Sequence, residues 1–248
     1  MRVLIGIDDT DNKESRGTGY NARQLAAAIE TNGLGKVRGI TRHQLLVHPD
    51  IPYTSQNSSA CLEVDCHDLP ALKTFARNFM LNVGAVGSDV GLCMVEKERV
   101  PEEIIQWGLD AKSIVLKMKT AIEKAEKQDI YLVGLTGTYG GVIGALAGVG
   151  LRAGGNDGRF IWINSEKNLR DIEQDVHNIE LLHQMAGIDE IQCHGEVISN
   201  PADRIWLNGW ARPVLKNHKS VLLVDKELNN NDYEWKCSAK ESVRLVSN

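Results

Sequence analysis

Three carboxylates follow directly on an apolar segment at the start of the chain. The segment from Arg2 to Ile7 predicts a buried strand, and Asp8, Asp9 and Asp11 come immediately after it. Carboxylates this close repel one another, so a hard cation or a basic partner between them would make the arrangement favourable. Mg²⁺ prefers oxygen ligands and is usually held by one or two carboxylates together with substrate phosphates. The pattern therefore predicts a magnesium site, with a solvated turn as the alternative interpretation.

A glycine-rich segment, Gly137 to Gly148, offers a second kind of chemistry. It follows an apolar run and opens a helical pattern. Glycine lets the backbone approach a phosphate closely, and a helix N-terminus adds N–H groups and the positive end of its dipole. No Gly-Lys-Ser/Thr follows, which excludes a Walker loop. We expect Gly140 and Gly141 to contact a phosphate, whereas Gly144 and Gly148, one helical turn apart, also fit close packing of the helix on a strand.

Two further polar segments have simpler explanations beside their chemical ones. The run from Tyr53 to Cys61 contains hydroxyl and amide groups, but alone it is typical of a loop. Cys66 and His67 have the residue types of a catalytic pair. A working pair is formed in space rather than in sequence, however, and Asp68 is explained as the cap of the following helix.

Segments of two periodicities are expected to position these groups. Fully apolar or alternating runs predict strands, and apolar residues three and four apart predict helices. The helical spacing from 101 to 128 fits either one long helix or two that join near residues 108–110. The predicted strands are 2–7, 37–47, 60–64, 91–95, 130–135, 159–163, 191–198, 204–207, 220–224 and, more loosely, 235–246; the predicted helices are 20–32, 68–81, 137–150 after its glycine-rich start, and 166–185.

The order of these elements predicts a mixed α+β (mixed α/β) protein with two domains. The first is an α/β domain of residues 1–150, and the second is a smaller α+β domain of residues 151–248. The glycine-rich stretch 150–158 marks the boundary. Open α/β sheets bind ligands outside the carboxyl ends of their strands, so we expect the three carboxylates to face a ligand there.

Composition excludes several classes of protein. The 248 residues are 42% hydrophobic and 25% charged, with a net charge of −5, which is typical of a folded chain and does not favour a general nucleic-acid-binding surface. Five sparse cysteines argue against a disulfide framework and for a reducing, cytoplasmic setting. Acids follow the apolar N-terminus too soon for a signal peptide, and the run 142–151 is too short to span a bilayer, so we expect no membrane association.

The motifs resemble, in this order, those of the archaeal agmatidine synthetase family. The shared segments are the Gly-Ile-Asp-Asp-Thr-Asp start at Gly6 to Asp11, Ile51 to Tyr53, the glycine-rich Gly141 to Gly150, and Arg212 to Leu215. The resemblance covers residues 1–160 well. It implies a kinase-like domain that binds ATP and Mg²⁺, followed by a ferredoxin-like domain. It ends before the family's OB-fold and zinc ribbon, and no Cys-x-x-Cys pair is present.

The resemblance implies an ATP- and Mg²⁺-dependent phosphotransferase-like enzyme that acts on a small-molecule or nucleotide substrate. Its acceptor and oligomeric state stay open. The alternatives are a non-catalytic nucleotide-binding regulatory module and a tRNA-modifying enzyme that uses a separate RNA-binding partner; the acidic charge does not favour nucleic acid. The three carboxylates would hold the metal, and one of them would act as a base. The residues expected to contact the nucleotide are Thr10, Thr18, Asn57, Ser58, Gly140, Gly141 and Gly144.

Overall fold

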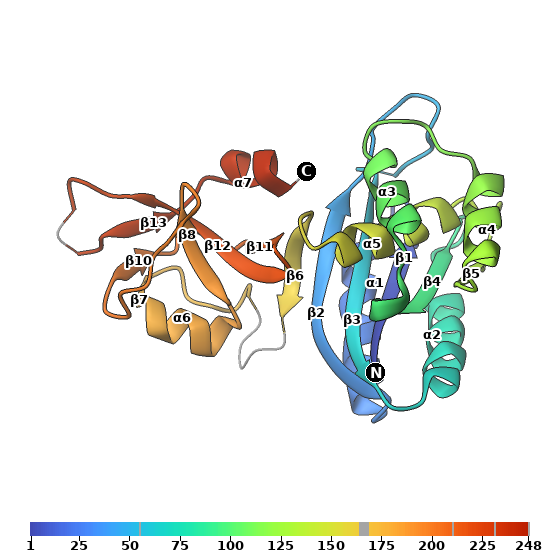
Figure 1. Ribbon diagram of the computed structural model, residues 1–248, viewed down its shortest axis with the longest axis horizontal. Coiled ribbons are helices and arrows are strands. Elements are labelled where there is room, and N and C mark those ends of the chain that lie inside the picture. Colours follow the sequence, from blue (N-terminus) through green and yellow to red (C-terminus); the bar gives the residue numbers. More distant parts are fainter. Residues whose placement is uncertain (55, 164–168, 210, 231, 248) are drawn as a thin grey trace. The chain divides into compact units, whose positions relative to one another are not determined.

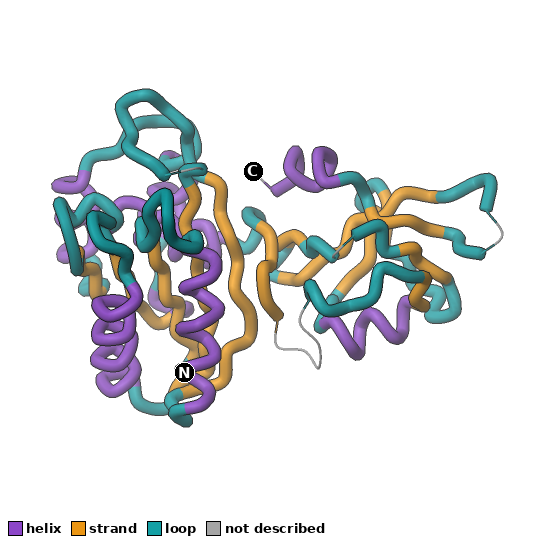
Figure 2. The backbone as a smooth tube through the Cα atoms, turned by 180° about the vertical axis from the view of Figure 1, so that it is seen from behind, coloured by secondary structure: helices purple, strands orange, loops and turns teal. Residues whose placement is uncertain are grey.

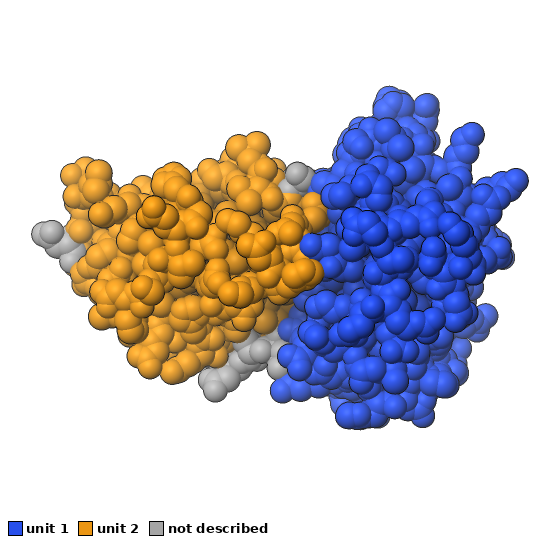
Figure 3. Space-filling model, viewed as in Figure 1, with its two compact units in different colours: residues 1–154 blue, residues 155–248 orange. Residues whose placement is uncertain are grey.

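The computed structural model describes residues 1–54, 56–163, 169–209, 211–230 and 232–247 (Figure 1). Within these ranges the protein is a mixed α+β structure with seven α-helices, which confirms the predicted fold class. The chain forms two compact units, residues 1–154 and residues 155–248, coloured separately in Figure 3.

The first unit contains an antiparallel sheet in the strand order β5-β4-β1-β3-β2 (Figures 1 and 2). The strands at Arg2–Asp8 and Gly91–Glu96 are short and mostly apolar. Several helices begin or end at recognisable signals, such as the cap that Asp68 provides for the second helix. The elements are β1 (Arg2–Asp8), α1 (Thr18–Thr31), β2 (Gly35–Gln44), β3 (Ser58–Cys66), α2 (Leu69–Val83), β4 (Gly91–Glu96), the 3₁₀ turn η1 (Lys97–Arg99), α3 (Glu102–Asp110), α4 (Met118–Lys127), β5 (Tyr131–Gly134) and α5 (Val142–Gly154).

The first six elements have the β-α-β-β-α-β order of the ferredoxin-like fold, with the four strands in the sheet order β4-β1-β3-β2. We predicted a ferredoxin-like domain for residues 151–248 instead, and that assignment stays a prediction. Neighbouring strands of the first unit run in opposite directions. The expectation of an edge formed by the carboxyl ends of the strands, as in an open α/β sheet, is therefore wrong. The edge at Asp8 combines the carboxyl ends of β1, β2 and β5 with the amino ends of β3 and β4.

Helices cover both faces of this sheet. On one face α5 packs on β1, β3 and β4, with α3 and α4 behind it, and α1 and α2 cover the other face (Figure 2). Glycine permits the close approach of α5: a Cβ at Gly6 would lie 2.1 Å from the carbonyl oxygen of Ala145, and one at Gly150 would lie 2.0 Å from that of Ile104. These contacts explain why α5 is rich in glycine even where it does not meet a ligand.

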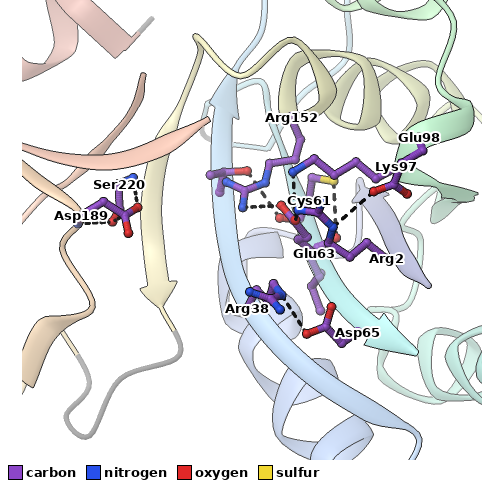
Figure 4. A network of polar contacts seen from close by, with 12 residues as sticks. Arg2, Arg38, Cys61, Glu63, Asp65, Lys97, Glu98, Arg152, Asp189 and Ser220 are labelled. Atoms are coloured by element: carbon purple, nitrogen blue, oxygen red, sulfur yellow. Dashed lines mark hydrogen bonds and ion pairs between the residues drawn. The ribbon is translucent and has the colours of Figure 1, made fainter. Parts of the chain in front are cut away.

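A buried ion-pair network joins the same helix to the sheet (Figure 4). Glu63 on β3 accepts a hydrogen bond from Arg152 of α5 at 2.8 Å and one from Lys97 at 2.9 Å. The side chains of Glu63 and Arg152 are only 5% and 6% exposed. The positive charges of Arg152 and Lys97 offset the cost of burying the carboxylate and hold its pKa below the ordinary value.

The second unit is a mixed sheet with two helices (Figure 1). One helix contributes to its main hydrophobic core, and the other is the last element of the chain that the structure describes. Strand β12 pairs with β11 and β13 in antiparallel fashion and with β8 in parallel. The elements are β6 (Arg159–Ile163), β7 (Val176–Asn178), α6 (Ile179–Ala186), β8 (Glu190–Cys193), β9 (Glu196–Val197), β10 (Arg204–Trp206), β11 (Val214–Lys216), β12 (Lys219–Lys226), β13 (Trp235–Cys237) and α7 (Lys240–Ser247).

Most predicted elements of the first unit are found within a few residues of their expected bounds, and the second unit holds the larger errors. Within the described part of the predicted helix 166–185, only 179–185 is helical, because Asn178 caps a new helix by accepting from the Leu181 N–H. Residues 166–168 of that prediction lie outside the described residues. The predicted strand 191–198 is a hairpin that turns at His194 and Gly195, both at positive φ. The predicted strand 235–246 ends at Cys237, and α7 follows.

Residues 101–128 form the two helices α3 and α4 rather than one, as the second of the two interpretations proposed. Among the described helices, none combines the length and the apolar character that crossing a membrane requires.

Candidate functional site

One pocket opens at the Asp8 edge of the first unit's sheet and encloses about 150 Å³. The carboxyl end of β1, the amino end of β3, the segment before it, and the start of α5 all contribute to its walls. The described lining residues are Asp8, Asp9, Asp11, Thr18, Leu45, Ile51, Pro52, Tyr53, Thr54, Gln56, Asn57, Ser58, Asp89, Ala111, Ile114, Leu116, Thr138, Gly140, Gly141, Ile143 and Gly144. The pocket therefore brings together groups from the three predicted motifs.

Asp8 and Asp9 form the inner acidic part of the pocket. Burial, with the nearby Asp9 carboxylate second, raises the pKa of Asp8 to about 8. Burial, followed by the charges of Asp89 and Asp11, raises the pKa of Asp9 to about 6. Asp9 has a φ of 50°, a left-handed conformation that costs energy for a residue other than glycine. Uncompensated negative charge and a strained backbone at one point are typical of a functional site.

Asp11 is fixed by the first turn of α1. Its Oδ1 accepts hydrogen bonds from the backbone N–H of Thr18 at 3.1 Å and from the Thr18 hydroxyl at 2.9 Å. Behind them, Thr10 donates to the Thr18 hydroxyl and in turn accepts from the side-chain amide of Asn21 at 2.9 Å. Thr10 is fully buried and is not among the lining residues. It lies beneath the site and holds Thr18, while its predicted contact with a nucleotide stays a prediction.

Asp89 is a fourth carboxylate of the pocket that the sequence analysis missed. It precedes β4, and its two side-chain oxygens accept from the backbone N–H and the hydroxyl of Thr138, each at 2.6 Å. Its backbone carbonyl also accepts from the N–H of Gly141. The sequence does show an acid just before an apolar strand. To place Asp89 in the pocket, however, one must also know that this strand lies beside β1 and runs antiparallel to it.

The glycine-rich segment lies very close to the acidic groups. A Cβ at Gly144 would lie 1.9 Å from Oδ2 of Asp8, and one at Gly141 would lie 2.3 Å from the carbonyl oxygen of Asp89. Three N–H groups at the start of α5 already have backbone acceptors: Gly141 donates to Asp89, Val142 to Tyr139 and Ile143 to Gly140. These three N–H groups are therefore not free to bind a phosphate. The helix contributes to the site mainly through the positive end of its dipole and through its small residues.

The pocket also has an apolar lining. Leu45, Ile114, Leu116 and Ile143 contribute aliphatic side chains, and the 51–58 segment adds Ile51, Pro52 and Tyr53 beside the polar Asn57 and Ser58. This segment is held in place because Asn57 donates to the Leu46 carbonyl at 2.7 Å. A ligand with one flat or apolar part and one charged part matches this combination of apolar and acidic lining residues.

The donor set fits a hard cation that arrives with a phosphate. The four carboxylates are oxygen ligands, and no Lys, Arg or His is among the described lining residues. Within the described ranges, no group of three or more His, Cys, Asp or Glu side chains is arranged to hold a metal ion by itself. Mg²⁺ commonly takes only one or two carboxylates and completes its shell with water and phosphate.

The predicted site residues other than Thr10 line this single pocket. The other candidates lie elsewhere. Asp68 caps α2 through the Ala71 N–H, as its sequence position predicted. Burial raises the pKa of the Cys66 thiol, which disfavours the thiolate that catalysis would need.

No protein-family model matches the chain. Solved structures of tRNA-modifying and tRNA-labelling enzymes resemble it: a tRNA fluorescent labelling enzyme is 28% identical with a TM-score of 0.54, over 60% of this chain and 36% of that one.

The tRNA-modifying enzyme among these structures is TiaS, an agmatidine synthetase of an isoleucine tRNA. Its apo structure is 28% identical with a TM-score of 0.53, and its complex with tRNA and ATP is 28% identical with a TM-score of 0.54. An uncharacterised protein of Methanocaldococcus jannaschii is 28% identical over 153 residues, or 60% of this chain. The chain spans about half the length of that curated relative and about 36% of the TiaS chain in the tRNA and ATP complex. The resemblance to part of agmatidine synthetase that the motifs predicted is confirmed.

Proposed function

We propose that this chain is an ATP- and Mg²⁺-dependent enzyme related to agmatidine synthetase that transfers a phosphoryl group. The observation that carries the proposal is the convergence of four carboxylates, from two separate segments, on the glycine-rich start of α5 in one pocket. Phosphoryl transfer requires positioning and charge neutralisation more than covalent help from the protein. The TiaS complex crystallised with ATP gives the proposal independent support.

In this proposal the acidic side of the pocket binds the metal and the phosphates. Asp8, Asp9 and Asp11 hold Mg²⁺, and Thr18, Gly140, Gly141 and Gly144 lie against the phosphate chain. Bound Mg²⁺ supplies positive charge to the phosphate oxygens. As the phosphorus–oxygen bond to the leaving nucleotide breaks, the acceptor oxygen bonds to phosphorus, and its proton passes to one of the carboxylates.

The apolar lining would hold the flat part of the nucleotide. Ile51, Tyr53, Ile114 and Leu116 offer apolar contact, while Asn57 and Ser58 offer hydrogen bonds to polar edges. Because no basic side chain is among the described lining residues, binding of the triphosphate should depend strongly on the divalent cation. That dependence separates this site from a pocket that binds a nucleotide through lysine or arginine.

A nucleic-acid substrate is the second candidate, and it is favoured by the likeness to TiaS in its complex with tRNA. The net charge of −5 indicates that a large part of the contact with RNA would come from another chain or domain. RNA that copurifies with the chain, or that binds only when a partner is added, would support this candidate. A bare phosphate or water as acceptor would oppose it.

The test is a thermal-unfolding panel of ATP, GTP and CTP with and without Mg²⁺, followed by an assay for released phosphate. We expect ATP with Mg²⁺ to raise the unfolding temperature and ATP alone to have little effect. Asp9→Asn should remove both the shift and the turnover, whereas Asp68→Asn, which keeps a good helix cap far from the pocket, should retain both. Binding without turnover would indicate the regulatory module, and no stabilisation by any nucleotide would overturn the proposal.

A further inference from the structure

Three side chains on adjacent strands form a polar row beneath α5. Ile7 of β1 pairs with Ala60 of β3, so the next residues outward, Asp8 and Ser59, are cross-strand neighbours. On the other side of β3, Ser59 lies directly opposite His43 of β2. Side chains paired in this way point to the same face of the sheet, with Cβ atoms about 4.5–5.5 Å apart.

Two glycines of α5 have no side chain and so make room for two members of this row, Asp8 and Ser59. A Cβ at Gly144 would lie 1.9 Å from Oδ2 of Asp8, and a Cβ at Gly148 would lie 2.8 Å from the Ser59 hydroxyl. The two glycines are one turn apart on the same helix face, as the sequence spacing predicted. Asp8 opens into the pocket, while Ser59 is fully buried directly behind it.

The Ser59 hydroxyl is an unusual group in this layer. It is completely buried, and no hydrogen-bond partner for it is found in the described ranges. The nearby histidine is already engaged, because Nε2 of His43 and the Thr41 hydroxyl share a hydrogen bond at 2.8 Å. An unpaired buried hydroxyl destabilises a fold, so its presence beside a carboxylate calls for an acceptor in another state of the molecule.

We propose that Ser59 is a positioning residue for Asp8, and that its hydroxyl donates to the inward-facing oxygen of that carboxylate when a cation occupies the pocket. The proposal rests on the proposed function, since it requires a cation at Asp8. The other oxygen of Asp8 would remain for the cation, and the hydroxyl would fix the orientation of the carboxyl group. Hydrogen bonds of this kind around metal ligands typically contribute 10- to 100-fold in metal affinity.

The test measures Mn²⁺ binding by electron paramagnetic resonance on the full chain, with a non-hydrolysable ATP analogue, together with thermal unfolding of the free protein. We expect Ser59→Ala to weaken Mn²⁺ binding by about 10- to 100-fold while the free protein unfolds at the same or a higher temperature. Ser59→Thr keeps the hydroxyl and should restore binding. Gly148→Ala moves the hydroxyl without removing it, and should also weaken binding.

Cys61→Ala is the matched control, because Cys61 is fully buried on the same strand and face and also loses one heavy atom. It should leave Mn²⁺ affinity unchanged. If the native chain binds Mn²⁺ with the analogue and Ser59→Ala binds it equally well, the positioning role is overturned while the proposed function stands. If Cys61→Ala weakens binding as much as Ser59→Ala, the effect is one of packing and the positioning role is overturned. If the native chain binds no Mn²⁺ with the analogue, both proposals are overturned together.

Discussion

Thr18 donates its backbone N–H and its hydroxyl to the same oxygen of Asp11, at 3.1 and 2.9 Å. This pairing gives Asp11 two separate tasks. One oxygen caps the start of α1, a position where the immediate N-cap residue, Gly17, offers no side-chain acceptor. The charge of the same carboxylate faces the pocket and raises the pKa values of Asp8 and Asp9.

The two tasks of Asp11 are separable by substitution. Asparagine caps a helix about as well as aspartate, whereas alanine loses roughly 1 kcal/mol of stability. We therefore expect Asp11→Asn to keep the free energy of unfolding near its native value and Asp11→Ala to lower it by about 1 kcal/mol. Both variants should lose the stabilisation by ATP and Mg²⁺ to a similar extent. Urea denaturation with and without ligand checks this, and equal stability of the two variants would argue against the capping role.

Gly144 and Gly140 provide a second contrast within the glycine-rich segment. A Cβ at position 144 would lie 1.9 Å from Oδ2 of Asp8, whereas the nearest atom to a Cβ at position 140 lies 3.6 Å away. We expect Gly144→Ala to destabilise the protein by about 1–3 kcal/mol through this overlap. Gly140→Ala should cost much less, and thermal unfolding of the free proteins compares them. Equal stability of the two variants would mean that Asp8 can leave the helix surface freely.

The sequence predicted the acidic part of the site better than its surroundings. Asp8, Asp9 and Asp11 are recognisable because one short segment contains them all, and Gly140 to Gly144 are recognisable for the same reason. The contact between Asp89 and Thr138 joins residues 49 positions apart, and no local pattern indicates it. The apolar lining from Ile51, Ile114 and Leu116 likewise forms only when two distant segments meet.

The errors in the second unit have the same cause: local patterns do not show how distant segments pack together. Leu169 and Ile172 have helical spacing and are buried, but they lie in turns and pack into the core without a helix. Val243 and Ser247 are the buried positions of α7, four residues apart on one face. The sequence predicted a loose strand over 235–246, which includes most of this helix. Periodicity identifies which residues are buried more reliably than the backbone that buries them.

The raised pKa values of Asp8 (about 8) and Asp9 (about 6) predict a pH dependence. Between about pH 4 and pH 8 the folded protein binds more protons at these groups than the unfolded chain, so their contribution to the free energy of unfolding falls as pH rises. Asp8→Asn should therefore be more stable than the native protein at about pH 8 and nearly equal to it at about pH 4. Urea denaturation at both pH values tests this, and a difference independent of pH would contradict it.

Metal binding predicts a pH dependence of the opposite direction. Mg²⁺ binds the charged carboxylates, so binding must release the protons that Asp8 and Asp9 hold. Stabilisation by Mg²⁺ with ATP should grow as pH rises from about 5 to 8, opposite to the trend of the free protein. A shift in unfolding temperature that is the same at both ends of this range would show that these two groups do not bind the cation.

The buried pair Glu63 and Arg152 should matter far more for stability than the exposed pair Arg38 and Asp65, which lies on β2 and β3 (Figure 4). Arg152→Met leaves the buried Glu63 carboxylate with Lys97 as its remaining close hydrogen-bond donor, so it should cost about 1.5–3 kcal/mol, the value of a hydrogen bond to a charged group. Arg38→Met, where the arginine is 56% exposed, should cost no more than about 1 kcal/mol. Urea denaturation measures both.

A double variant identifies the cause of that loss. Glu63→Leu combined with Arg152→Met removes both charges, so it should recover much of the stability that Arg152→Met loses, since an apolar pair of similar size often replaces a buried ion pair without cost. Lys97 then keeps its charge but lies 17% exposed, where water can reach it. A double variant less stable than either single variant would mean that the pair holds α5 on β3 by its shape and hydrogen bonds, and that charge compensation is secondary.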